Sequence, residues 1–123
     1  MKIYLDVCCL NRPFDDSSQS RVRLEAEAVL SILEMGEAGE LEIIDSDIIE
    51  DEISVMPDVE RQAKVGSLLM RCVTRIPLTS AVERRGLKLT GWGISPMDAL
   101  HLASAESARA DVLLTTDDDT ENS

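Results

Sequence analysis

The sequence predicts an α/β domain, a three-layer α/β/α sandwich in which helices cover both faces of a central, mainly parallel sheet. Segments with the pattern of strands alternate with segments with the pattern of helices, which is typical of parallel strands joined by crossover helices. The 123 residues have the length of one domain, and no linker, repeat or low-complexity stretch divides them. We therefore expect residues 1–123 to form a single domain.

The N-terminal third is expected to hold one strand and one long helix. Residues 2–8 are almost all apolar and predict a strand buried on both faces. Residues 11–20 are rich in turn-forming residues and predict a loop. From 20–38 the apolar residues recur at helical spacing, and Gly36 and Gly39 mark the end of this helix.

The middle of the chain is expected to add a short strand and two helical segments. Residues 41–45 form the strand, and Ser46 is a good N-cap for a helical turn through about Ile53. Pro57 and Asp58 are expected to begin the next helix, which carries its apolar residues on one side.

The C-terminal third predicts two further strands and two further helices. Residues 74–79 read as a strand that Pro77 places at a sheet edge, and a helix follows to about Leu89. The clearest helix of the chain covers 95–110, with Pro96 at its first position. Residues 111–116 are expected to form the last strand.

The charge of the chain limits its partners. Twelve Lys and Arg face twenty-four Asp and Glu, and the net charge is -12. Such a charge argues against a general nucleic-acid coat and against binding to anionic membranes. No long apolar segment and no basic flank leading into an apolar signal region occurs. With an odd number of cysteines, three, we expect a reduced, cytoplasmic protein without a membrane partner.

The cysteines offer two alternative chemistries. Zinc would need about four ligands from Cys8, Cys9, Cys72 and His101, and no CxxC or HxxxH spacing is present. A nucleophilic pair of Cys8 or Cys9 with His101 has no local signature either. We therefore expect the cysteines to be packing residues.

Several acidic residues are expected at the same edge of the predicted sheet. Asp6 lies near the end of the first strand, Asp117 just past the last, and Asp98 in the first turn of the helix before it. Ligands of parallel α/β sheets bind beyond the carboxyl ends of the strands. Converging carboxylates repel each other unless a cation neutralises them, and an all-oxygen ligand set favours Mg²⁺ or Mn²⁺. The acids that follow the second strand are Asp47, Glu50, Asp51 and Glu52.

The order of these motifs resembles the PIN domain, the fold of metal-dependent ribonucleases that includes the VapC-like toxins of toxin-antitoxin pairs. The stretches that carry the resemblance are IYLDVCCLNRPFDD, SDIIEDEI, SPMDALHLASA and LLTTDDD. They span nearly the whole chain, and their order is more specific than any one of them.

The resemblance implies a set of site residues. The first, third and fourth acids of the family fall on Asp6, Asp98 and Asp117, which would be metal ligands, and the second falls on Glu52. These four would be the catalytic residues. Further candidates, as positioning groups or as alternatives to these acids, are Asn11, Ser46, Glu50, Thr116 and Asp119. Arg12 is a weaker candidate for a phosphate contact.

The same residues also admit purely structural interpretations. Asp98 could serve only the dipole of its helix, and Asp117 to Asp119 could be a solvated run of charge. At least one of the acids between 50 and 52 is expected on an exposed helix face. His101 is interpreted as a hydrogen-bonded packing residue that orients an acid rather than performing chemistry.

The chain departs from the family after LLTTDDD. PIN domains usually continue with an aromatic residue, another helix and a last strand, whereas this sequence ends at TENS. We therefore expect a C-terminally shortened PIN-like domain with weakened or absent catalysis. The exposed sheet edge predicts self-association, as a homodimer.

The leading hypothesis is a Mg²⁺- or Mn²⁺-dependent endoribonuclease that hydrolyses RNA and is the toxin of a type II pair, with an antitoxin protein as its partner. The alternative is a catalytically impaired PIN-fold module that binds a partner or antitoxin. A phosphoacceptor domain of the response-regulator type ranks last, because its late strand is normally followed by a lysine and here by Thr115 and Thr116.

Overall fold

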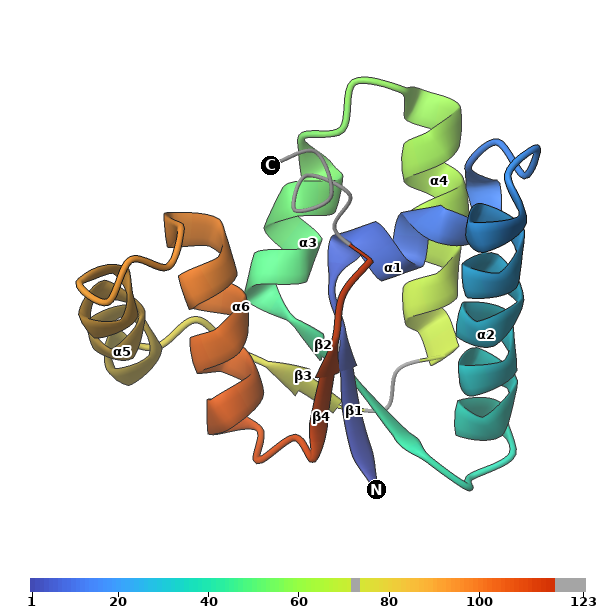
Figure 1. The fold of residues 1–123 in the computed structure, drawn as a ribbon. Helices are drawn as coiled ribbons and strands as arrows, with labels where there is room; N and C mark the ends of the chain where they lie inside the picture. Colours follow the sequence, from blue (N-terminus) through green and yellow to red (C-terminus); the bar gives the residue numbers. More distant parts are fainter. Residues whose placement is uncertain (72–73, 117–123) are drawn as a thin grey trace.

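The computed structural model describes residues 1–71 and 74–116, which form a sheet of parallel strands between two layers of helices (Figure 1). The strands are β1 (Lys2–Leu5), β2 (Glu42–Ser46), β3 (Thr74–Ile76) and β4 (Val112–Leu114). Their order across the sheet is β3-β2-β1-β4, and every pairing is parallel. The predicted α/β class and three-layer architecture are confirmed, and β3 lies at a sheet edge as Pro77 indicates.

The helices lie on both faces of this sheet. Figure 1 shows α2 and α4 along one side and α6 along the other, with α5 outside α6. No helix of the described part of the chain is long and apolar enough to cross a membrane. The α-helices are α1 (Val7–Asn11), α2 (Ser20–Glu37), α3 (Asp47–Ser54), α4 (Val59–Leu68), α5 (Ser80–Thr90) and α6 (Pro96–Ser107), and short 3-10 turns occupy Arg12–Phe14 and Leu69–Arg71.

The strand predicted over residues 2–8 ends earlier in the structure, and a helix rather than a loop follows it directly. β1 stops at Leu5, and Val7 already belongs to α1. Asp6 is the N-cap of α1, because its carboxylate accepts a hydrogen bond from the backbone N–H of Cys9 at 3.0 Å. This bond satisfies an N–H group that the first helical turn leaves unpaired, so the chain turns directly from strand to helix.

The inner strands form the centre of the core. Ile3, Tyr4 and Leu5 of β1 and Ile43 and Ile44 of β2 are all buried. Such continuous burial is expected where helices cover both faces of a parallel sheet. This core therefore holds the ends of the strands in place, and the candidate site is built from those ends.

Side-chain caps fix where three other helices begin. Ser46 accepts a hydrogen bond from the N–H of Ile49 at the start of α3, at 3.1 Å. Asp58 caps α4, and Thr79 caps α5 in the same way. The helix starts expected at Ser46, at Asp58 and at Thr79 or Ser80 are therefore confirmed.

Candidate active site

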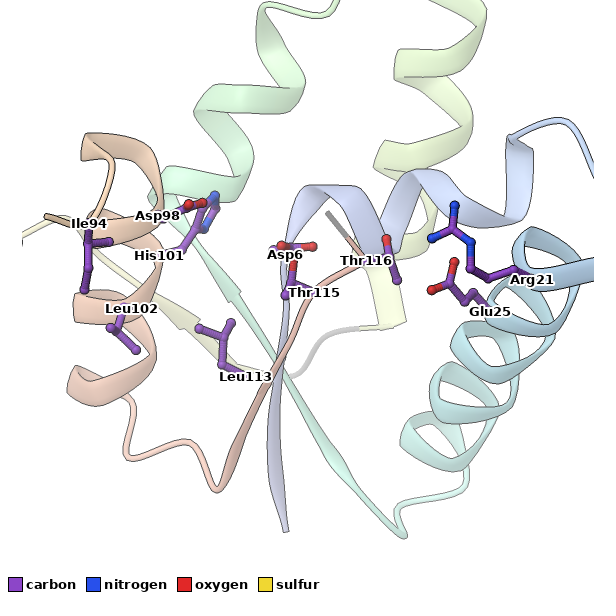
Figure 2. A pocket seen from close by; sticks show the side chains of 10 residues that line it. All are labelled: Asp6, Arg21, Glu25, Ile94, Asp98, His101, Leu102, Leu113, Thr115 and Thr116. Atoms are coloured by element: carbon purple, nitrogen blue, oxygen red, sulfur yellow. The ribbon is translucent and has the colours of Figure 1, made fainter. Parts of the chain in front are cut away.

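A cavity of about 460 Å³ opens where β1 and β4 end, between α6 and α2. Figure 2 shows Asp98 and His101 on the α6 side, Arg21 and Glu25 on the α2 side, and Asp6 with the residues after β4 between them. This is the edge of the sheet at which ligands of parallel α/β folds bind. The lining residues are Asp6, Arg21, Glu25, Ile94, Asp98, His101, Leu102, Leu113, Thr115 and Thr116.

Asp6 and Asp98 lie on this cavity together, from chain positions that are 92 residues apart by number. Asp6 is held firmly, because its N–H donates to the carbonyl of Leu114 at 3.2 Å while its Oδ1 caps α1. Asp98 is exposed in the first turn of α6, where a negative charge is favoured by the helix dipole. The structure therefore brings together two of the acids that the sequence singled out.

The segment after β4 adds hydroxyl groups to the cavity. Thr115 and Thr116 both line it. Within the described residues the Oγ1 atom of Thr116 is buried and has no hydrogen-bond partner. An unpaired buried hydroxyl normally costs free energy, so this oxygen is a group that a bound ligand could satisfy.

Arg12 and Asn11 have structural partners instead of facing the cavity. The guanidinium of Arg12 is buried, donates to the carbonyl of Thr116 at 2.8 Å and pairs with Asp15 and Glu25. The amide of Asn11 donates to the carbonyl of Val7 and accepts from Arg61. Neither residue is among those that line the cavity.

Sequence reasoning missed the two charged residues that α2 contributes. Arg21 and Glu25 lie one turn apart at the start of α2 and both line the cavity. The pattern that could have indicated them is their spacing of four, which puts them on one helix face. Nothing in the sequence says that this face meets the ends of β1 and β4, because that depends on tertiary packing.

His101 belongs to a buried chain of hydrogen bonds below the cavity. The hydroxyl of Tyr4 lies 2.7 Å from Ser46 Oγ and 2.7 Å from His101 Nδ1. The other ring nitrogen, Nε2, contacts the carboxylate of Glu52. Ser46 therefore connects to Glu52 through two side chains from other elements, although both belong to the β2–α3 segment.

Glu50 faces a different partner. Its side chain hydrogen-bonds that of Asp45, a buried residue near the end of β2. Burial and this neighbouring carboxyl group raise the pKa of Asp45 to about 7, so Asp45 holds a proton below neutral pH. Glu50 and Glu52, which the sequence left as alternatives, thus lie in separate environments, and neither lines the cavity itself.

The donor set around the cavity fits a hard cation only in part. Among the described residues, no three His, Cys, Asp or Glu side chains lie close enough together to hold a metal ion. Asp6 and Asp98 nevertheless offer carboxylates, and Thr116 offers its buried hydroxyl. Mg²⁺ is usually bound through one or two carboxylates together with waters and substrate phosphates, and such a site needs no third protein acid. Asp117 and Asp119, which the sequence proposed as further acids, lie outside the described residues.

The alternative chemistries of the cysteines find little support. Cys9 is buried, and burial raises the pKa of its thiol well above the usual range, so it stays protonated and contacts the carbonyl of Leu114. Both ring nitrogens of His101 are occupied by Tyr4 and Glu52. Cys9 therefore acts as a packing residue, whereas Cys8 is exposed, and Cys72 lies outside the described residues.

Comparisons with known proteins support the fold. No family model matches the sequence, and no curated protein matches it. Among solved structures, a chain from the crystal structure of VapBC2 from Rickettsia felis, bound to a DNA fragment from their promoter, is similar with a TM-score of 0.59. The two chains are 19% identical, and the match covers 99% of this chain and 92% of that chain. This likeness agrees with the PIN-like fold expected from the sequence.

Proposed function

We propose that this chain is a metal-dependent endoribonuclease and the toxin of a type II toxin-antitoxin pair. The observation that carries the proposal is the presence of Asp6 and Asp98 on one cavity at the carboxyl ends of β1 and β4. The similar fold in a VapBC2 complex supports the toxin-antitoxin part.

The proposed cofactor is Mg²⁺ or Mn²⁺, held by Asp6 and Asp98 and by Asp117, which lies outside the described residues. When bound, such an ion would polarise the phosphodiester group and lower the pKa of the attacking water. Thr116 would orient a carboxylate or a water through its buried hydroxyl, which has no hydrogen-bond partner among the described residues. Glu52 would act from beside the cavity, where His101 contacts it.

The wall formed by α2 gives the cavity a positive group for an RNA backbone. Arg21 lies on the side of the cavity away from α6 (Figure 2), so a phosphate between the two walls would meet a guanidinium on one side and the acids on the other. Arginine suits this task because its planar fork matches phosphate oxygens. We assign Arg21 to this contact in place of Arg12, which is buried among its ion-pair partners.

The proposed partners are an antitoxin protein and a second copy of this chain, in the cytoplasm. The similar solved structure is a complex named for both components of VapBC2. For self-association, β4 lies at one edge of the described sheet, and an edge strand can pair with another chain.

A catalytically impaired module that binds an antitoxin is the second candidate. The observation that favours it is the lack of any three-acid cluster within residues 1–71 and 74–116. Partner binding without metal-dependent RNA cleavage would select this function over the first.

RNA cleavage tests the proposal. Purified wild type is incubated with a labelled single-stranded RNA in Mn²⁺ or Mg²⁺, with and without a chelator, beside Asp6→Asn and Asp98→Asn. We expect cleavage that needs the metal and that falls by at least about a hundredfold in both variants. Asp51→Asn is the matched control, because Asp51 is exposed on α3 away from the cavity. Cleavage that survives chelation, or that both variants retain, would overturn the proposal.

A further inference from the structure

The hydrogen-bond chain from Ser46 to Glu52 has a geometry that restricts where its protons lie. Tyr4 is fully buried in β1, and its hydroxyl has two partners at 2.7 Å, Ser46 Oγ and His101 Nδ1. A phenol has a single proton, so Tyr4 donates to one of these partners and accepts from the other, while the buried Ser104, a further hydrogen-bond partner of the phenol, can donate to its oxygen. The direction in this chain decides which nitrogen of His101 carries hydrogen.

The two ends of the chain favour one direction. At the Glu52 end, a carboxylate accepts hydrogen bonds, so an Nε2 without hydrogen would place a lone pair against negative charge. At the Ser46 end, Oγ already accepts from the N–H of Ile49, which leaves its own proton for the oxygen of Tyr4. Burial raises the pKa of Tyr4 far above its ordinary value, so the phenol keeps its proton.

We propose that His101 is a positioning residue for Glu52. Ser46 donates to Tyr4, Tyr4 donates to Nδ1 of His101, and Nε2–H donates to the carboxylate of Glu52, which is thereby fixed beside the cavity. His101 is itself a wall of that cavity and lies one turn after Asp98 on α6. The role of His101 in cleavage rests on the proposed nuclease function, whereas the direction of the hydrogen bonds does not.

The burial of His101 and the partial exposure of Glu52 explain how His101 can position this carboxylate. The side chain of His101 is 6% exposed and that of Glu52 is 28% exposed. The imidazole is therefore held by core groups, and the carboxylate at its far end is partly open to solvent. Groups that orient an active-site side chain from behind typically change activity about 10- to 100-fold when they are lost.

The direction of the chain can be observed without any activity assay. His101 is the only histidine of the chain, so its ring nitrogens can be assigned without ambiguity in a long-range ¹H–¹⁵N NMR spectrum of the full chain. We expect hydrogen on Nε2 and none on Nδ1 at neutral pH. Tyr4→Phe, which removes the donor at the same shape, should move the Nδ1 resonance because that lone pair loses its hydrogen-bond donor, while Nε2 keeps its hydrogen because Glu52 still accepts it.

Ser46→Ala is the matched control for this experiment. It removes the first link of the chain and the cap of α3, but it leaves the bond between Tyr4 and His101. The nitrogen pattern of the wild type should persist in it. Hydrogen on Nδ1 in the wild type overturns the proposal, and this result needs no variant to fold.

Kinetics on RNA tests the consequence for Glu52. His101→Leu should lower kcat about 10- to 100-fold with little change of KM. His101→Gln, whose amide can donate from near the position of Nε2, should recover much of that loss. Equal loss in both variants, or a change in KM alone, would overturn the positioning role. Absence of cleavage by the wild type would instead refute the proposed function, and the NMR result would still decide the direction of the chain.

Discussion

Glu50 and Glu52 are separated by one residue of α3, yet their carboxylates have different partners. Glu52 contacts His101, which lines the cavity, whereas Glu50 pairs with the buried Asp45 of β2. Two residues of α-helix turn a side chain through about 200°, so neighbouring acids of one helix face opposite sides. This geometry separates one carboxylate that contacts the candidate site through His101 from one that pairs with Asp45.

The two glutamates should therefore respond differently to the same substitution. Glu52→Gln is expected to lower RNA cleavage by at least about tenfold, because the amide lacks the charge that acid-base chemistry needs. Glu50→Gln should leave the cleavage rate within about twofold. Rates of both variants on one RNA substrate test this, and a larger loss in Glu50→Gln would reverse the assignment.

Asp45 should make stability depend on pH. Its pKa is about 7 in the folded chain and near 3.8 in the unfolded chain, so the folded state binds more protons between these values. The free energy of unfolding is then expected to fall as pH rises from about 4 to 7, and the penalty is complete above pH 7.

Asp45→Asn isolates this contribution. Asparagine can still accept from the N–H of Ser46 and donate to Glu50, but it carries no charge to desolvate. At pH 8 the variant should be more stable than the wild type by about 1 to 3 kcal/mol, and near pH 4 the difference should shrink towards zero. Denaturant unfolding of both proteins at the two pH values measures this, and a difference independent of pH would contradict it.

Asp6 combines a structural and a proposed catalytic role that substitutions can separate. Asn is as good an N-cap as Asp, so Asp6→Asn should unfold within about 0.5 kcal/mol of the wild type while losing RNA cleavage. Asp6→Ala should lose cleavage and also about 1 kcal/mol of stability, because the N–H of Cys9 loses its acceptor. Denaturation curves beside cleavage assays test both parts. Cleavage retained by Asp6→Asn would leave Asp6 as a cap alone.

Self-association is expected from the edge position of β4. The expected species at tens of micromolar protein is a dimer, and analytical ultracentrifugation distinguishes it from a monomer. A single monomeric species at that concentration would exclude pairing through this edge under those conditions.

The sequence predicted the order of the elements better than their ends. The alternation of patterns along the chain was enough for the parallel sheet and its covering helices. The end of β1 was misjudged, because Val7, Cys9 and Leu10 are as apolar as strand residues and are indeed buried. The cap that Asp6 provides favours a helix there. The pattern of apolar residues does not show this one local hydrogen bond, so it could not distinguish the helix from a longer strand.

The site was predictable to the extent that it follows from topology. Asp6 and Asp98 could be placed together because a crossover helix runs back against the strands, so the first turn of α6 lies at the same edge of the sheet as the end of β1. The partners of Glu50 and Glu52, the burial of Arg12 and the place of Arg21 depend on how helices pack onto the sheet. Asp45 was read as part of a strand, and its raised pKa arises from burial next to Glu50, which no one-dimensional pattern reveals.

The most direct test of the central claim is calorimetric titration of Mn²⁺ into the wild type, Asp6→Asn and Asp98→Asn without RNA. If the two carboxylates hold one cation, the wild type should bind Mn²⁺ saturably, and each variant should bind it at least about tenfold more weakly. Equal binding by all three proteins, or no saturable binding by the wild type, would contradict the claim that Asp6 and Asp98 form a metal site.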